Sequence, residues 1–113
     1  MSESALVQSI LVEASSRGHR LFRNDQGVAR YSRGGHSYSV AYGVGGPGAP
    51  DLIGWTRTGE FCAIEVKVRG KKPKAHQAAW MAAALESCAG LRVGWANSVS
   101  GAMEILEGPL PPT

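Results

Sequence analysis

The segment APDLIGWTRTGEFCAIEVKV, from Ala49 to Val68, constrains the fold more than any other part of the chain. Residues 51–55 and 61–68 have the length and the apolar, partly β-branched composition of buried strands. The polar, glycine-containing stretch Thr56–Glu60 between them is typical of a turn. The segment therefore predicts two antiparallel strands joined as a hairpin.

Three charged side chains interrupt this apolar pattern. Side chains alternate along a strand, so Glu65 and Lys67 face the same side of the predicted hairpin. If the turn is odd in length and symmetrical about Thr58, Asp51 lies opposite Glu65, with the two Cβ atoms about 4.5–5.5 Å apart. We expect two carboxylates and one ammonium group on one face. An even-length turn or a bulge would direct Asp51 away from Glu65.

Two opposed carboxylates need a compensating positive charge, because like charges directly opposite each other destabilise a sheet. Lys67 supplies one such charge, and a divalent cation would supply more. The oxygens of Asp51 and Glu65 are hard ligands that suit Mg²⁺ or Mn²⁺ and are poorly suited to zinc. A cation at this pair, with Lys67 beside it, predicts hydrolysis of a phosphodiester. The alternative is an edge hairpin whose charged groups are simply solvated.

The rest of the chain predicts three helices and four further strands. We expect helices at Ser4–Ser16 (capped by Ser2 or Ser4), at Lys74–Cys88 and, after a Ser98 or Ser100 cap, up to Leu106, with strands at Arg20–Arg23, Val28–Tyr31, Tyr38–Tyr42 and Leu91–Ala96. The turn-rich residues 24–27 predict a hairpin between the first two of these strands. The helical crossover before residues 91–96 predicts parallel, right-handed pairing with residues 61–68. The fold class is therefore α/β, a central mixed β-sheet flanked by α-helices, in one domain over 1–113 with a flexible tail at about 108–113.

Length and composition exclude several other classes. A chain of 113 residues can bury a core of its own, and Cys62 and Cys88 lie in apolar runs that favour two buried, reduced thiols over a zinc site. The N-terminus lacks the basic flank of a signal peptide, and no apolar run approaches the roughly 20 residues that span a bilayer. We expect a soluble cytoplasmic protein that does not contact membranes.

Other local features bear on a polyanionic ligand. The formal net charge is +3, and four cations fall within Arg69–Lys74, directly after the charged strand. Solvated loop charges are the simpler interpretation of that cluster. The glycine-rich loop Gly43–Pro50 allows close approach of a ligand to the backbone, but it lacks the Gly-Lys-Ser/Thr of a Walker A loop. Gln77, in the first turn of its helix, and Glu13, at the border of a buried stripe, are further candidates. Each alone is more simply a helix-start or surface residue.

These residues resemble a known nuclease family. Pro50-Asp51 followed by Glu65-Val66-Lys67 resembles the PD-(D/E)XK signature, and the surroundings resemble its virus-type replication-repair nuclease (VRR-NUC) branch. The further matches are Glu13 in the first helix, Arg23-Asn24 with Gly27, the run Gly48–Leu52, and Gln77 followed by Trp80. The resemblance extends from about Leu6 to Asn97, nearly the whole chain.

The resemblance implies a restriction-endonuclease-like core that requires Mg²⁺ or Mn²⁺. Carried over by position, Asp51, Glu65 and the backbone carbonyl of Val66 are metal ligands. Lys67 is catalytic, and Gln77 and Glu13 support it. The basic residues that would contact DNA are Arg23, Arg33, Arg69, Lys71, Lys72 and Lys74. The loops Arg33–His36 and Gly43–Gly48 would rim the site.

The resemblance also implies a substrate. Small stand-alone members from phages and bacteria resemble dimeric Holliday junction resolvases, so we expect a homodimer that cleaves four-way DNA junctions. A nuclease for flaps, nicked duplexes or single strands, and a non-catalytic DNA-binding protein on the same scaffold, stay open as alternatives.

Overall fold

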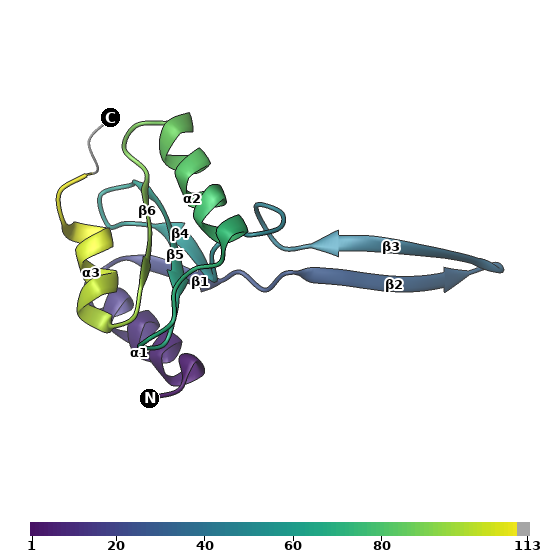
Figure 1. The fold of residues 1–113 in the computed structure, drawn as a ribbon, viewed down its shortest axis with the longest axis horizontal. Helices are drawn as coiled ribbons and strands as arrows, with labels where there is room; N and C mark the ends of the chain where they lie inside the picture. The colour runs from purple at the N-terminus through teal and green to yellow at the C-terminus, as the bar shows by residue number, and fades with distance from the viewer. Residues whose placement is uncertain (111–113) are drawn as a thin grey trace.

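Four strands form a mixed sheet in the computed structural model, which describes residues 1–110 (Figure 1). The sheet order is β1-β4-β5-β6, with bounds Arg20–Arg23, Leu52–Trp55, Phe61–Val66 and Arg92–Ala96. Strand β4 pairs antiparallel with β1 and β5, and β5 pairs parallel with β6 after the crossover through α2 (Ala75–Ser87). The predicted α/β class, mixed sheet and parallel pairing are confirmed.

Helices cover both faces of this sheet. Helices α1 (Glu3–Ser16) and α3 (Val99–Glu107) pack on one face, and α2 lies over the other (Figure 1). The main core lies on the α1 and α3 face and includes Ile64, whereas the smaller core beneath α2 includes Ala63 and Met81. Alternate residues of β5 therefore supply two different cores, as the alternation of side chains along a strand requires.

Two serine caps fix where the outer helices begin. Ser2 Oγ accepts a hydrogen bond from the Ala5 N–H at 3.1 Å, and Ser98 Oγ accepts one from the Gly101 N–H at 3.0 Å. Each cap satisfies a backbone donor that the first helical turn leaves unpaired. Ser2 and Ser98 are thus the caps used, and not their alternatives Ser4 and Ser100.

The register of β4 and β5 confirms the odd-length turn. Trp55 lies opposite Phe61, and Ile53 lies opposite Ala63. The Thr56 N–H donates to the Glu60 carbonyl at 2.8 Å, which closes the connection without a bulge in the described ladder. The charged residues at the far end of the hairpin therefore keep the facing that strand parity assigns to them.

A separate two-stranded hairpin arm projects from the sheet (Figure 1). It consists of β2 (Gly27–Arg33) and β3 (His36–Tyr42), and every residue of β3 is exposed. The arm makes the longest dimension of the molecule 53 Å, compared with 33 and 28 Å along the other axes. Gly34 and Gly35 at its end have φ of 58° and 79°, the two positive angles that a type I′ turn requires.

The predicted hairpin between residues 20–23 and 28–31 is wrong. Strand β1 joins the main sheet beside β4, and β2 pairs with β3 instead. The Asn24 N–H donates to the Asp51 carbonyl at 2.7 Å, so the chain continues along β4 at the point where a tight turn was expected. The Gly34-Gly35 pair accommodates the reversal because glycine adopts positive φ without steric cost.

The cysteines and the C-terminus modify two other expectations. Cys62 is buried, and burial raises the pKa of its thiol to about 12, but Cys88 is exposed because it follows the last residue of α2. The prediction of two buried thiols is therefore wrong for Cys88. Gly108 caps α3, and residues 111–113 of the predicted tail lie outside the described residues. Within residues 1–110, no helix is both long enough and apolar enough to cross a bilayer.

Candidate active site

Asp51 and Glu65 interlock where β4 begins and β5 ends. The Asp51 N–H donates to Glu65 Oε1 at 3.2 Å, and Asp51 Oδ2 accepts from the Val66 N–H at 3.0 Å. The backbone of each strand thus binds the carboxylate of the other. The geometry follows directly from the register, because Asp51 lies two residues before Ile53 on the same face.

Glu65 is the carboxylate of the site whose ionised form is most disfavoured by its surroundings. It is only 1% exposed, and within residues 1–110 its Oε2 atom is the single buried side-chain oxygen or nitrogen that has no hydrogen-bond partner. Burial, followed by the hydrogen bond and negative charge of Asp51, raises the pKa of Glu65 to about 7. The Lys67 ammonium, with Nζ 3.5 Å from Oε2, acts in the opposite direction. This one cation does not fully compensate the two carboxylates.

The donor set at this pair fits a hard divalent cation. Mg²⁺ and Mn²⁺ bind through a few carboxylates and keep several sites for water or substrate oxygen. Glu65 Oε2 accepts no hydrogen bond from residues 1–110, and the Lys67 ammonium at 3.5 Å is the cation paired with it. Among residues 1–110, no group of three or more His, Cys, Asp and Glu side chains is close enough to hold a metal ion. A cation here therefore needs ligands beyond the two carboxylates.

The backbone of Val66 is placed to contribute one such ligand. The Lys67 N–H donates to the Ala96 carbonyl of β6 at 3.0 Å, and successive residues of a strand turn their amide groups to opposite neighbours. The peptide groups of Val66 therefore face the β4 side, where its N–H already binds Asp51. The role of the Val66 carbonyl as a metal ligand stays a prediction.

Asn24 holds the loop before Asp51 in place. Its Nδ2 donates to the carbonyls of Pro50 and Val44 at 3.1 and 2.8 Å, and its Oδ1 accepts from the Val44 N–H at 2.9 Å. Gln26 adds bonds from its Nε2 to the carbonyls of Val44 and Gly46. The glycine-rich loop Gly43–Pro50 is thus tied to the end of β1, which fixes the backbone position of Asp51.

Helix α2 is tied to the same loop. The Trp80 Nε1–H donates to the Gly45 carbonyl at 2.8 Å, and Gln77 Oε1 accepts from the Lys74 N–H at 2.8 Å. Gln77 therefore caps the start of α2, since its side chain satisfies a donor of the first turn. No described hydrogen bond joins Gln77 to Asp51 or Glu65, so its catalytic role stays a prediction.

The structure does not bring Glu13 to this site. Its Oε1 accepts from Arg17 Nε at 3.1 Å, and Arg17 also binds Glu107 at 2.6 Å. Glu107 in turn contacts the buried His19 ring at 2.8 Å. These bonds lower the pKa of Glu107 and join the end of α1 to the end of α3. The expectation that Glu13 adds a carboxylate near Asp51 is therefore not met geometrically.

Glu3 is the acidic residue of α1 that lies near Asp51. It lines a hollow of about 240 Å³ whose other walls include Arg23 and Asp51. Helix α1 and strand β1 are consecutive and pack together, so the start of α1 lies beside the end of β1. That end of β1 is adjacent to the start of β4. Because α1 and β1 run antiparallel, Glu3 at the start of the helix lies near the end of β1 and Asp51, whereas Glu13 lies at the far end of the helix.

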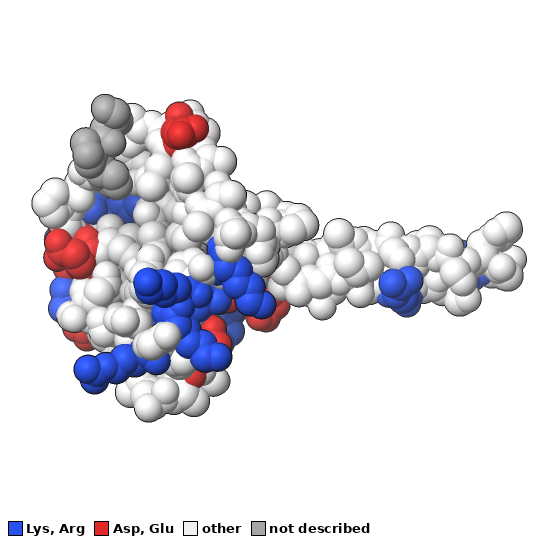
Figure 2. All heavy atoms as spheres, viewed as in Figure 1, with Lys and Arg blue, Asp and Glu red and all other residues white. Residues whose placement is uncertain are grey.

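The basic residues divide into two groups. Arg69, Lys71, Lys72 and Lys74 are exposed in the connection between β5 and α2. Figure 2 shows Lys and Arg gathered on the face where this connection passes α1. Arg33 instead lies at the end of the arm beside Gly34. The expectation that the Arg33–His36 loop rims the site is wrong, because that loop is the distal turn of the hairpin.

Comparison with known proteins identifies one family. The family model described as the VRR-NUC domain matches residues 12–100, which include Asp51, Glu65, Lys67 and Gln77. None of the curated proteins and none of the solved structures with which the chain was compared matches it significantly.

Proposed function

The chain belongs to the VRR-NUC family, whose domain is a nuclease of the PD-(D/E)XK type, and from this premise we propose a metal-dependent endonuclease that cuts branched DNA. The observation that carries the proposal is the buried Glu65 carboxylate, which is bonded to the Asp51 backbone and has one oxygen that accepts no hydrogen bond within residues 1–110. A buried carboxylate that served only the fold would accept hydrogen bonds at both oxygens, because a buried acceptor without a hydrogen bond costs free energy. The cost is explained if a cation binds there.

Each residue of the pair has a definite role in this proposal. Asp51, Glu65 and the Val66 carbonyl would hold Mg²⁺ or Mn²⁺, which when bound polarises the scissile phosphate and promotes ionisation of the attacking water. Lys67 brings a fixed positive charge to the same place, with Nζ 3.5 Å from Glu65 Oε2. Its side chain is 16% exposed, so water screens its charge only partly. Lys67 therefore stabilises negative charge that develops on the phosphate during hydrolysis.

Two further side chains support the site. Glu3 lines the hollow beside Asp51 and takes the place that sequence analysis gave to Glu13. It would act through water, because Glu3 is not part of a three-carboxylate cluster among the described residues. Gln77 uses its Oε1 to cap α2, which leaves its Nε2 group able to bond a phosphate oxygen.

The exposed cations around the site would bind the DNA backbone. Arg23 lines the same hollow as Asp51, and the four cations of the connection after β5 lie beside Lys67 in the chain. Long basic side chains in exposed positions contact phosphates without reading bases. Affinity should therefore fall steeply as salt concentration rises, and a flat salt response would remove the case for this basic surface.

Four-way junctions are the preferred substrate in our proposal, with the protein acting as a homodimer. A two-fold dimer presents two sites to a junction that is itself nearly two-fold, which allows paired incisions. The enzymatic alternative is a nuclease for flaps, nicks or single strands, because the catalytic core would be the same. A non-catalytic DNA-binding protein is disfavoured by the joint presence of Asp51, Glu65, Lys67 and Gln77.

A cleavage panel tests the proposal. Wild type, Lys67→Met, Asp51→Asn and the control Glu104→Gln are incubated with labelled junction, flap, nicked and linear DNA, with Mg²⁺, Mn²⁺ or EDTA. Glu104 is an exposed carboxylate of α3, so its variant matches the charge change of Asp51→Asn at a remote position. We expect metal-dependent cleavage by wild type and control, with the junction cut fastest, and a loss of at least about 100-fold in the two site variants. Equal cleavage by Lys67→Met, or none by wild type with either metal, contradicts the proposal.

The mass in solution separates the two enzymatic alternatives. If the protein sediments as a dimer and introduces paired nicks into a junction, symmetrical resolution is supported. A monomer that prefers flaps supports the alternative nuclease.

A further inference from the structure

The hairpin arm of β2 and β3 carries positive charge only. Residues 27–42 contain Arg30 and Arg33 but no Asp or Glu, although the chain has 9 acidic residues. Figure 2 shows basic atoms and no acidic atoms on the visible face of the arm. The most exposed part of the molecule is therefore also free of negative charge.

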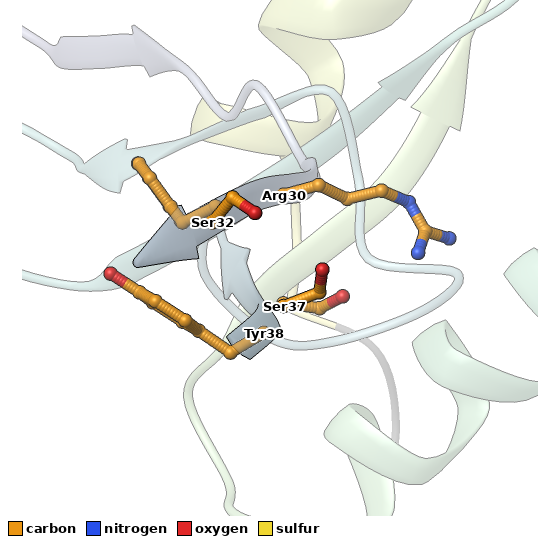
Figure 3. Close-up of a pocket in the computed structure, with 6 residues that line it drawn as sticks. Arg30, Ser32, Ser37 and Tyr38 are labelled. Carbon is orange, nitrogen blue, oxygen red and sulfur yellow. The ribbon is translucent and has the colours of Figure 1, made fainter. Parts of the chain in front are cut away.

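The two faces of the arm differ in chemistry. The register pairs Arg30 with Ser39 and Ser32 with Ser37, which places one guanidinium and three hydroxyl groups on one face. Figure 3 shows Arg30, Ser32 and Ser37 directed to one side and Tyr38 to the other. On the opposite face Tyr31 and Tyr38 stack with ring centroids 5.3 Å apart. One face thus offers hydrogen-bond donors, and the other stiffens the ribbon through a cross-strand aromatic pair.

The donors on the polar face are unused. No hydrogen bond or ion pair within residues 1–110 involves the side chains of Arg30, Ser32, Ser37 or Ser39. Together with Tyr31 and Tyr38 they line a hollow of about 400 Å³. Arginine and serine side chains are the common donors to phosphate oxygens in protein–DNA complexes.

The root of the arm is fixed relative to the active site. Asn24 and Gln26, at the start of the arm, bind the carbonyls of Val44 and Gly46, at its end. Asn24 also binds Pro50 and Asp51 through the bonds described above. The arm and Asp51 therefore share one hydrogen-bonded base, so DNA placed at the site has a defined relation to the arm.

Charge decides which partner fits this ribbon. An isolated two-stranded hairpin is only marginally stable in water, so a partner that covers it would stabilise it. Docking on another protein surface would desolvate Arg30 and Arg33, which is costly unless that surface supplies acidic groups. DNA supplies phosphates along its whole length, and its major groove, about 12 Å wide, admits a two-stranded ribbon.

We propose that the arm is a DNA-binding ribbon whose Arg30 and serine face contacts the phosphates of one duplex branch of the substrate. The proposal rests on the nuclease function above and adds where the substrate extends. A seven-residue strand spans about 20 Å at about 3.3 Å per residue, which equals about six base pairs of B-DNA at 3.4 Å each. A duplex branch of about 4 base pairs, about 14 Å long, is therefore shorter than the arm, whereas a branch of about 12 base pairs extends past its tip.

Binding in EDTA tests the arm without relying on cleavage. Dissociation constants are measured for junctions with branches of about 4 and about 12 base pairs, using wild type, Arg30→Gln, and the control Arg57→Gln. Arg57 is an exposed residue in the β4–β5 turn, so both variants remove one surface charge. We expect Arg30→Gln to weaken binding to long branches about 3- to 10-fold and to reduce the salt slope by about one. Its binding to short branches, and the binding of Arg57→Gln to both, should change less than twofold.

Three outcomes decide the matter. If Arg30→Gln and Arg57→Gln have the same effect on long branches, the arm does not bind DNA. If Tyr31→Ala with Tyr38→Ala converts a dimer into a monomer while Arg30→Gln leaves affinity unchanged, the arm is an interface between two copies and the proposal is wrong. Absence of metal-dependent cleavage by wild type, together with a specific Arg30 effect on binding, overturns the nuclease function and leaves the DNA-binding arm standing.

Discussion

Replacing Glu65 with glutamine should make the metal-free protein more stable at pH 8. Burial and Asp51 raise the pKa of Glu65 from 4.5 to about 7, so the folded state holds a proton that the unfolded chain has already released. Between these values the native state binds more protons, and the free energy of unfolding therefore falls as pH rises. At 1.36 kcal/mol per pKa unit, the full difference amounts to about 3 kcal/mol above pH 7, and it vanishes below about pH 4.5.

Urea unfolding in EDTA at pH 5 and pH 8 measures this effect. We expect Glu65→Gln to unfold at similar urea concentrations to wild type at pH 5 and to be about 2–3 kcal/mol more stable at pH 8. Adding Mg²⁺ at pH 8 should stabilise wild type, by about 2.7 kcal/mol at 100 times Kd, and should not stabilise the variant. The difference in unfolding free energy between Glu65→Gln and wild type should therefore become smaller or change sign when Mg²⁺ is present.

Glu60 provides a control of opposite sign. Hydrogen bonds from Thr58 and Arg92 lower the pKa of Glu60 to about 2, so its stabilising effect is complete above pH 4.5 and is lost as pH falls toward 2. Glu60→Gln should therefore destabilise the protein at pH 8. The reasoning about Glu65 is refuted if Glu65→Gln is destabilising at pH 8, or if its effect is the same at pH 5 and pH 8.

Three further predictions concern other parts of the molecule. Glu3→Gln should reduce junction cleavage in Mg²⁺ at least about tenfold, whereas Glu13→Gln should leave the cleavage rate within about twofold; the reverse order would restore Glu13 to the site. Glu107→Ala removes the partner of the buried His19 and should lower the free energy of unfolding by about 1–3 kcal/mol by urea titration, with the cleavage rate of the folded protein unchanged. Gly34→Ala should lower the free energy of local opening of the arm by about 1 kcal/mol, because alanine is strained at φ 58°. Amide exchange should therefore become faster in β2 and β3 but not in β5.

The hairpin of β4 and β5 follows from local sequence. Its two apolar runs, the five-residue turn and the alternation of side chains suffice to place Glu65 and Lys67 on one face and Asp51 opposite Glu65. These rules are short-range, since each depends only on strand parity and turn length. The α2 crossover and its parallel pairing follow equally, because strand, helix and strand can connect compactly in one hand only.

Long-range contacts decided the features that local sequence left open. The residues Asn24–Gln26 have the composition of a turn, but Asn24 forms hydrogen bonds with the backbone of Asp51 and Val44. Strand β1 therefore joins the main sheet, and the chain reverses later, at Gly34-Gly35. Local propensity cannot decide which of two turn-rich segments reverses the chain when the choice depends on strand partners that are distant in sequence.

The choice between Glu3 and Glu13 shows the same division. Periodicity places both on one helix, but only the packing of α1 against β1 determines which end of the helix lies near Asp51. The burial of Glu65, and with it the raised pKa, is likewise tertiary, because the side chain is withdrawn from water only in the assembled fold. The sequence by itself determined which charged groups meet, through the parity of one hairpin. The tertiary structure determined how strongly they interact, because solvent exclusion is a property of the assembled fold.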